Sequence, residues 1–232
     1  METLPNGFSL EVPEGAFPLS TDSMVLAHFV HLPRAARVLD LGSGCGTLGL
    51  LLAASRQDCS VTGIEITEIA HSAALLNIQR NCLEGRMKSI CADLRQVPEL
   101  FPAGSFGTVV SNPPYFSAGP ASRSLPAARR EDLCSPRDLF SAASHALKFG
   151  GDFFLVHRPE RLAELIALGA QANLQCKRLG LLRHRQDGPV CLVLLQLRKG
   201  AKPGLILEEM ALRDRDGRPT EDYKQIYHME ES

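Results

Sequence analysis

The sequence predicts an α/β fold with a doubly wound, mostly parallel sheet, and two patterns support this prediction. From Arg37 onward, short apolar runs alternate with longer segments that have helical periodicity. Such alternation is typical of parallel strands joined by helices that cover both faces of a sheet. Near the end of the chain, two apolar runs flank Asp187-Gly188, a turn sequence that predicts an antiparallel hairpin. We therefore expect a seven-stranded sheet with one antiparallel edge strand.

The expected strands are short runs in which β-branched, aliphatic and aromatic residues are frequent. The fourth of them stops at a double proline, because proline has no N–H to donate to a neighbouring strand. The expected strands are Arg37–Gly42, Ser60–Ile66, Met87–Asp93, Phe106–Asn112, Asp152–Arg158, Leu179–Leu182 and Val190–Leu197.

The expected helices begin or end at residues that commonly cap helices. A Ser-Thr-Asp stretch opens the first helix, Pro159 suits the first turn of the last one, and glycines follow the ends of two others. The expected helices are Ser23–His31, Thr47–Ser55, Glu68–Cys82, Pro136–Leu147 and Pro159–Ala170. Residues 117–135 have no periodicity, and a loop of this length in a compact domain is usually functional or disordered.

Length and composition are those of an ordinary globular protein. The chain has 232 residues, of which 44% are hydrophobic and 22% charged, and its net charge is −1. We expect a single domain over residues 1–232. No apolar stretch approaches the roughly 20 residues that cross a bilayer, and no secretory signal is recognisable, so we expect a cytoplasmic protein with no membrane partner. The seven cysteines are scattered without zinc spacing, which predicts reduced thiols and no metal.

A glycine-rich turn after the first expected strand indicates a nucleoside cofactor. Glycines let the backbone approach a ligand closely, and open parallel sheets bind ligands beyond the carboxyl ends of their strands. Acidic residues end the next two strands, where one carboxylate can accept from ribose hydroxyls and the other from an adenine amino group. The residues that carry this prediction are Asp40, Gly42, Gly44, Gly46, Glu65 and Asp93.

Two cofactors fit the glycine pattern. Gly44-Cys-Gly46-Thr-Leu-Gly49 satisfies the G-x-G-x-x-G pattern of dinucleotide sites. Asp40 favours S-adenosyl-L-methionine (SAM), because an acid can meet the charged amino end of methionine but would repel a pyrophosphate. We therefore expect SAM, with a dinucleotide as the alternative.

The sequence Asn112-Pro113-Pro114-Tyr115 follows the fourth expected strand and suits catalysis on a planar amine. The lone pair of such an amine is delocalised, so two fixed acceptors on its N–H groups help to direct the lone pair toward a methyl group. We expect these acceptors to be the side-chain oxygen of Asn112 and the backbone carbonyl of Pro113, with φ locked by the two proline rings. Tyr115 offers a flat face on which the target can stack. The catalytic effect is then orientation and stabilisation of developing charge.

Together these motifs resemble the Rossmann-like class I SAM-dependent methyltransferases that modify planar amines. More narrowly, the chain resembles the bacterial tRNA1(Val) adenine-N6 methyltransferase family. The narrower resemblance includes Leu19-Ser-Thr-Asp22, Ala128-Arg-Arg-Glu131 and the closing segment Leu205–Tyr227. It implies that residues 1–36 form an N-terminal extension packed on the cofactor pocket. It also implies cofactor contacts for Thr21, Asp22, Ile66, Leu94 and Asn112.

The resemblance implies an RNA substrate, with the adenine 3′ of a tRNA anticodon as the target. RNA binding favours a basic surface, and Arg129 and Arg130 follow the Tyr115 loop directly. Phe116 can extend the stacking wall. Arg137 and a group of basic residues at 177–185 are further candidates for a phosphate-contacting rim. We assume a monomer.

Several other functions share parts of this pattern. Protein glutamine-N5 methyltransferases also use Asn-Pro-Pro-Tyr, but they usually carry a helical N-terminal domain for which this chain has no room before Arg37. DNA adenine and guanine-N2 methylation are further alternatives with the same chemistry. A nicotinamide-dependent oxidoreductase is the alternative from a different class, and it would need a substrate domain and a proton donor that the sequence does not show.

Overall fold

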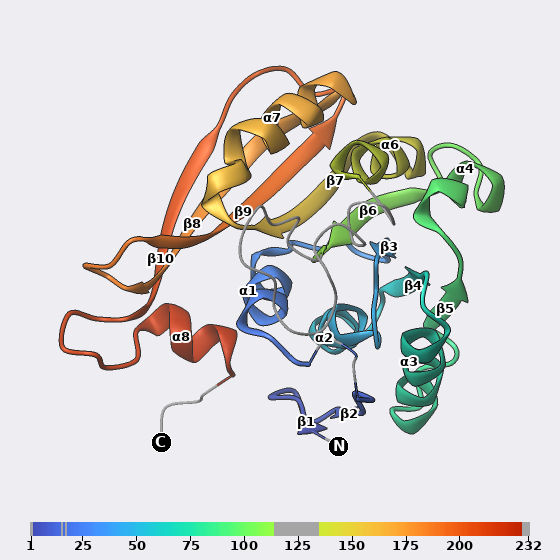
Figure 1. Ribbon diagram of the computed structural model, residues 1–232, viewed down its shortest axis with the longest axis horizontal. Helices are drawn as coiled ribbons and strands as arrows, with labels where there is room; N and C mark the ends of the chain where they lie inside the picture. The colour runs from blue at the N-terminus through green and yellow to red at the C-terminus, as the bar shows by residue number, and fades with distance from the viewer. Residues whose placement is uncertain (1, 15, 17, 114–134, 229–232) are drawn as a thin grey trace.

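A large twisted sheet runs through the molecule, with helices on both of its faces (Figure 1). The structure is a computed structural model that describes residues 2–14, 16, 18–113 and 135–228. In the described residues the sheet has eight strands in the order β10-β8-β9-β7-β6-β3-β4-β5. The strands are β3 (Arg37–Leu41), β4 (Ser60–Glu65), β5 (Met87–Cys91), β6 (Phe106–Ser111), β7 (Leu147–His157), β8 (Leu174–Arg185), β9 (Val190–Lys199) and β10 (Ile206–Arg213).

The helices form two layers, each over a separate hydrophobic core (Figure 1). The first layer contains α1 (Thr21–Phe29), α2 (Thr47–Ser55), α3 (Glu68–Arg80) and α8 (Glu221–Ile226). The second contains α4 (Val97–Leu100), α6 (Pro136–Ala146) and α7 (Leu162–Gln171), with short 3-10 turns η1 (Leu94–Gln96) and η2 (Pro159–Arg161). A small hairpin of β1 (Glu2–Thr3) and β2 (Ser9–Leu10) lies beside α3.

The expected α/β class with a mostly parallel sheet is confirmed, and the closing hairpin forms as β8 and β9. The sheet differs from the expectation in two respects. An additional strand, β10, pairs in parallel with β8. The antiparallel strand β9 pairs with both β7 and β8, so it lies between them rather than at the edge. The apolar residues Ile206 and Leu207 begin β10, and the backbone of this strand pairs with the edge that β8 would otherwise expose.

The parallel arrangement determines where the candidate site lies. Strands β3, β4, β5 and β6 run in one direction, so their carboxyl ends meet at one edge of the sheet. The glycine turn follows β3, Ile66 follows β4, Asp93 follows β5 and Asn112 follows β6. All four therefore lie at the edge where open parallel sheets bind their ligands.

Five of the expected site residues fall outside the described residues: Pro114, Tyr115, Phe116, Arg129 and Arg130. Among the helices that the structure does describe, none has the length and apolar character that a membrane span requires.

Candidate active site

The glycine turn between β3 and α2 presents its backbone to open space. Gly42, Gly44 and Gly46 have φ angles of 74°, 54° and 84°, which other residues adopt only with strain. The N–H groups of Gly42 and Ser43 both donate to the carbonyl of Ile64, at 2.9 and 3.0 Å. Among the described residues, a Cβ placed on Gly42 or Gly44 would meet no atom within 4 Å. The turn is thus fixed against β4 on one side and accessible on the other.

Glu65 ends β4, and its side chain forms a hydrogen bond with this turn. Its Oε2 accepts from the N–H of Gly44 at 2.9 Å. Its Oε1 accepts from both the N–H and the hydroxyl of Thr67, at 2.8 and 2.7 Å. A carboxylate has about four acceptor positions, so the carboxylate of Glu65 retains capacity for a ligand hydroxyl.

Asp40 lies in β3, two residues before Gly42, and is almost completely buried, with 2% of its surface exposed. Burial, and then the nearby charge of Glu65, raise the pKa of Asp40 to about 7. Its Oδ2 and the Oγ of Ser43 are buried and have no hydrogen-bond partner among the described residues. Buried polar atoms are normally hydrogen-bonded, so these two atoms suit a ligand that donates to them.

The residues after β5 are arranged differently from those of the turn. Asp93 caps η1, where its Oδ1 accepts from the N–H of Arg95 at 2.9 Å. Its Oδ2 accepts from Nε of Arg95, also at 2.9 Å, and this pairing lowers the pKa of Asp93. The N–H of Ala92 donates to the backbone carbonyl of Glu65, which joins the two strand ends. Ile66 is exposed and Leu94 is half-buried beside them.

Asn112 is tied to the first helix. Its Nδ2 donates to Oγ of Ser23 at 2.9 Å, although the two residues are 89 positions apart in the chain. Pro113 is buried directly after it. On the same helix, the hydroxyl of Thr21 lies 3.1 Å from that of Tyr227, and Asp22 lies in the first turn. Helix α1 therefore connects the end of β6 to the carboxyl-terminal helix α8.

The structure thus joins the glycine turn to Glu65 through hydrogen bonds, and it buries Asp40 two residues before Gly42. It links Asn112 to α1, whereas the carboxylate of Asp93 pairs with its own neighbour. Three contacts were not anticipated from the sequence: Ser23 with Asn112, Thr67 with Glu65, and Asn77 with the carbonyl of Cys45. Asn77 could have been noticed as a polar residue among the apolar positions of α3.

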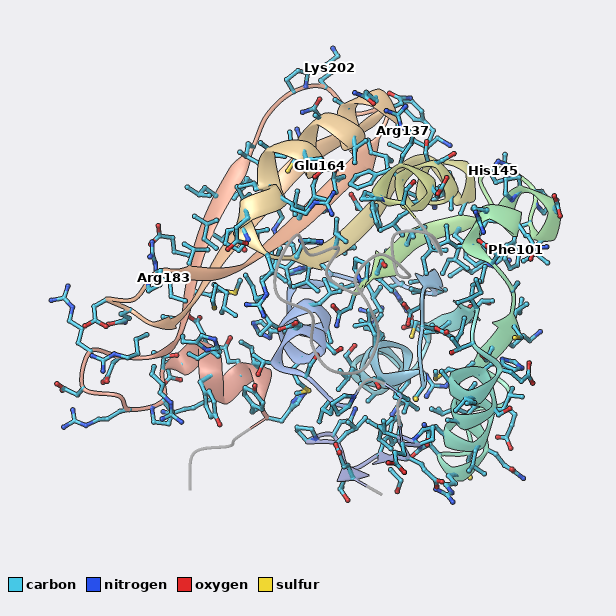
Figure 2. The ribbon with its side chains drawn as sticks, viewed as in Figure 1. Phe101, Arg137, His145, Glu164, Arg183 and Lys202 are labelled. Atoms are coloured by element: carbon cyan, nitrogen blue, oxygen red, sulfur yellow. The ribbon has the colours of Figure 1, made fainter. Side chains whose placement is uncertain are left out.

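The basic residues of the expected rim that the structure describes, Arg137 and those at 177–185, do not form one patch. Figure 2 shows Arg137 at the upper right, by α6, and Arg183 at the left, by β8. Arg178 pairs with Glu208 through Nε and Nη2, at 2.9 and 2.8 Å, and its guanidinium lies 4.2 Å from the ring centroid of Phe29. These contacts give Arg178 a structural role between β8, β10 and α1.

Comparisons with known proteins identify the family. The model of the family described as "methyltransferase small domain" matches residues 18–170. The chain belongs to this methyltransferase family. A relative from Tolumonas auensis, named tRNA1(Val) (adenine(37)-N6)-methyltransferase, is 30% identical over 222 residues, which cover 93% of this chain and 90% of the relative.

Solved structures of methyltransferases share the fold. A predicted O-methyltransferase from Agrobacterium tumefaciens has a TM-score of 0.76 at 23% identity, covering 90% of this chain and 96% of that one. A geranyl diphosphate C-methyltransferase from Streptomyces coelicolor, solved with S-adenosyl-L-homocysteine, has a TM-score of 0.58 at 13% identity, covering 77% and 78%. Membership of this methyltransferase family supports SAM as the cofactor. The accessible glycine turn and the unpartnered atoms of Asp40 and Ser43 fit such a group.

Proposed function

We propose that this methyltransferase transfers a methyl group to the exocyclic N6 amine of an adenine in RNA. The substrate is a tRNA, and the target adenine lies near the anticodon. The observation that carries the proposal is the Tolumonas auensis relative, whose similarity extends over 93% of this chain and whose name states this reaction. The position of Asn112-Pro113 at the same sheet edge as the glycine turn supports it.

The residues around the turn have distinct roles in binding SAM. Asp40 would accept from the ammonium of the methionine part, and this pairing would compensate the cost of its burial. Glu65 would accept from a ribose hydroxyl while it continues to hold the N–H of Gly44. Asp93, together with Ile66 and Leu94, would line the adenine end. SAM, when bound, supplies an electrophilic methyl group on its sulfonium.

Asn112 and Pro113 would hold the methyl acceptor. With Nδ2 of Asn112 bonded to α1, its Oδ1 is the acceptor available to one N–H of the target amine. The carbonyl of Pro113 would accept from the other N–H. Fixing both N–H groups directs the nitrogen lone pair and stabilises the positive charge that develops on nitrogen. Pro114, Tyr115 and Phe116 would complete the wall on which the base stacks.

The proposed adenine-N6 methylation is tested by incubating the purified protein with labelled SAM and bulk tRNA. After incubation with the purified protein, nucleoside mass spectrometry of the tRNA should reveal labelled N6-methyladenosine. Label in protein glutamine, in N2-methylguanosine or in DNA would overturn the proposal. Asn112→Ala should abolish turnover and leave SAM affinity within a few-fold, whereas Asn81→Ala, the same change outside this edge, should retain turnover.

A salt titration tests the RNA rim. Arg129→Ala combined with Arg130→Ala should raise the KM for tRNA and flatten its dependence on salt, because each lost phosphate contact reduces counterion release. An unchanged salt slope would exclude both arginines from the rim.

A further inference from the structure

We propose that Ser23 is a positioning residue that orients the amide of Asn112, so that Oδ1 rather than Nδ2 faces the methyl acceptor. The inference rests on the proposed function only in that the acceptor is an amine. It follows from a contact between a buried hydroxyl on α1 and the residue that ends β6.

The geometry makes Ser23 a fixed partner. Its Oγ lies 2.9 Å from Nδ2 of Asn112, and the residue is buried, with 7% of its surface exposed. The N–H of Ser23 donates to Oγ of Ser20, the N-cap of α1, at 3.4 Å. Helix α1 packs against α2, β7 and β9, so the hydroxyl is attached to a rigid part of the fold.

The chemistry explains why an asparagine needs such a partner. The two ends of its amide have nearly the same shape but opposite hydrogen-bonding character, because the oxygen accepts and the NH₂ group donates. A target amine brings N–H donors, so an amide turned the wrong way would place donor against donor. The amide orientation therefore decides whether the acceptor is bound productively.

A serine hydroxyl can accept and donate, so the direction of its own O–H also matters. Oγ of Ser20 lies 3.5 Å from Oγ of Ser23, which places an acceptor near the O–H of Ser23. When that proton points to Ser20, Oγ of Ser23 is left as an acceptor toward Asn112. The hydrogen bonds then run in one direction. Nδ2 of Asn112 donates to Ser23, the hydroxyl of Ser23 donates to Ser20, and Oδ1 of Asn112 is left facing the substrate.

The first experiment compares kinetic constants for tRNA methylation. Ser23→Ala should lower kcat about fivefold to tenfold, the kinetic equivalent of losing about one hydrogen bond, and change the KM for SAM less than twofold. Ser23→Thr, which keeps the hydroxyl, should restore kcat. The control is Ser144→Ala on α6, which removes a hydroxyl that donates to the carbonyl of Ala172 and leaves Ser23 in place. It should leave kcat unchanged.

A second variant separates orientation from general loosening of the site. In Asn112→Asp, the carboxylate presents an acceptor whichever way it is turned. Adding Ser23→Ala to that variant should lower kcat less than twofold. An equal fall in both backgrounds, or a kcat of Ser23→Ala within twofold of the wild type, would overturn the proposal.

A third measurement does not depend on the substrate. In ¹⁵N NMR spectra, the side-chain NH₂ group of Asn112, assigned from its loss in Asn112→Asp, should exchange with water faster in Ser23→Ala than in the wild type. Identical exchange would overturn the role of Ser23 even if RNA methylation is confirmed. If exchange is faster in Ser23→Ala but the wild type does not methylate RNA, the contact between Ser23 and Asn112 is supported and the proposed function is rejected.

Discussion

Asn77 offers a sharp test of how the glycine turn is held, because its side chain joins the turn to the N-terminal segment. The residue lies in α3 and has no exposed surface. Its Oδ1 accepts from the N–H of Glu11 at 2.8 Å. Its Nδ2 donates to the carbonyls of Glu11 and Cys45, at 2.9 and 3.0 Å. Cys45 is part of the glycine turn, so Asn77→Ala should affect both stability and cofactor binding.

The size of the effect follows from the number of bonds. A hydrogen bond within a protein contributes about 1 kcal/mol on average, and the three bonds of Asn77 together contribute about 3 kcal/mol. In a domain of this size, each 1 kcal/mol lowers Tm by about 2–4 °C, so the variant should melt about 6–12 °C lower. Release of the Cys45 carbonyl should weaken SAM binding severalfold.

Asn81, which caps the carboxyl end of α3, provides a matched control four residues later. Its Oδ1 accepts from the N–H of Ser9 at 2.9 Å, and its Nδ2 donates to the carbonyls of Ser9 and Asn77, at 2.8 and 2.7 Å. Asn81→Ala removes a similar set of hydrogen bonds to the backbone of β2. The side chain of Asn81 has no hydrogen bond to the glycine turn among the described residues. Urea unfolding and calorimetric titration with SAM distinguish the two variants. A SAM affinity that changes equally in both, or in neither, would refute the role assigned to Asn77.

Two further predictions concern the region of the turn. In Gly63→Ala, the new Cβ would lie 2.5 Å from Oγ of Ser43, so the turn must shift and calorimetry should show weaker SAM binding. The control is Gly85→Ala, where no atom of the described residues lies within 4 Å, and it should leave SAM binding unchanged. The pKa of Asp40 is about 7 in the folded protein, against an ordinary value of 3.8. The folded protein therefore loses stability relative to the unfolded chain as pH rises between these two pKa values. Relative to Asp40→Asn, the wild type should therefore be less stable to urea at pH 8 than at pH 5, and a difference that does not vary with pH would contradict this.

The sequence was sufficient to predict that the candidate site residues lie at one edge of the sheet. Alternating strand and helix patterns determine a parallel sheet, and the carboxyl ends of parallel strands share an edge whatever the details of packing. The positions of the glycine turn, Glu65 and Asn112 follow from that rule alone. The eighth strand, β10, was not among the seven expected strands of the sheet, because its pairing with β8 depends on which sheet edge remains open.

The contacts that orient the site were not predictable in the same way. Ser23 and Asn112 are 89 positions apart, and Asn77 and Glu11 are 66 apart. Helix α1 buries Ser23 among Met24, Val25 and Leu26, so its sequence pattern does not show which face meets β6. Such pairs depend on the final packing of helices on the sheet, which local patterns do not encode.

The glycine turn explains why a distant contact such as that between Asn77 and Cys45 is needed. A glycine has no side chain, so only its N–H and carbonyl groups can hold the turn in place. In this protein the partners are the carbonyl of Ile64, the carboxylate of Glu65 and the amide of Asn77. The freedom that lets the turn approach a cofactor is thus offset by side chains on β4 and α3. Changes at those positions should therefore alter cofactor binding even where a side chain contacts only the backbone of the turn, as that of Asn77 does.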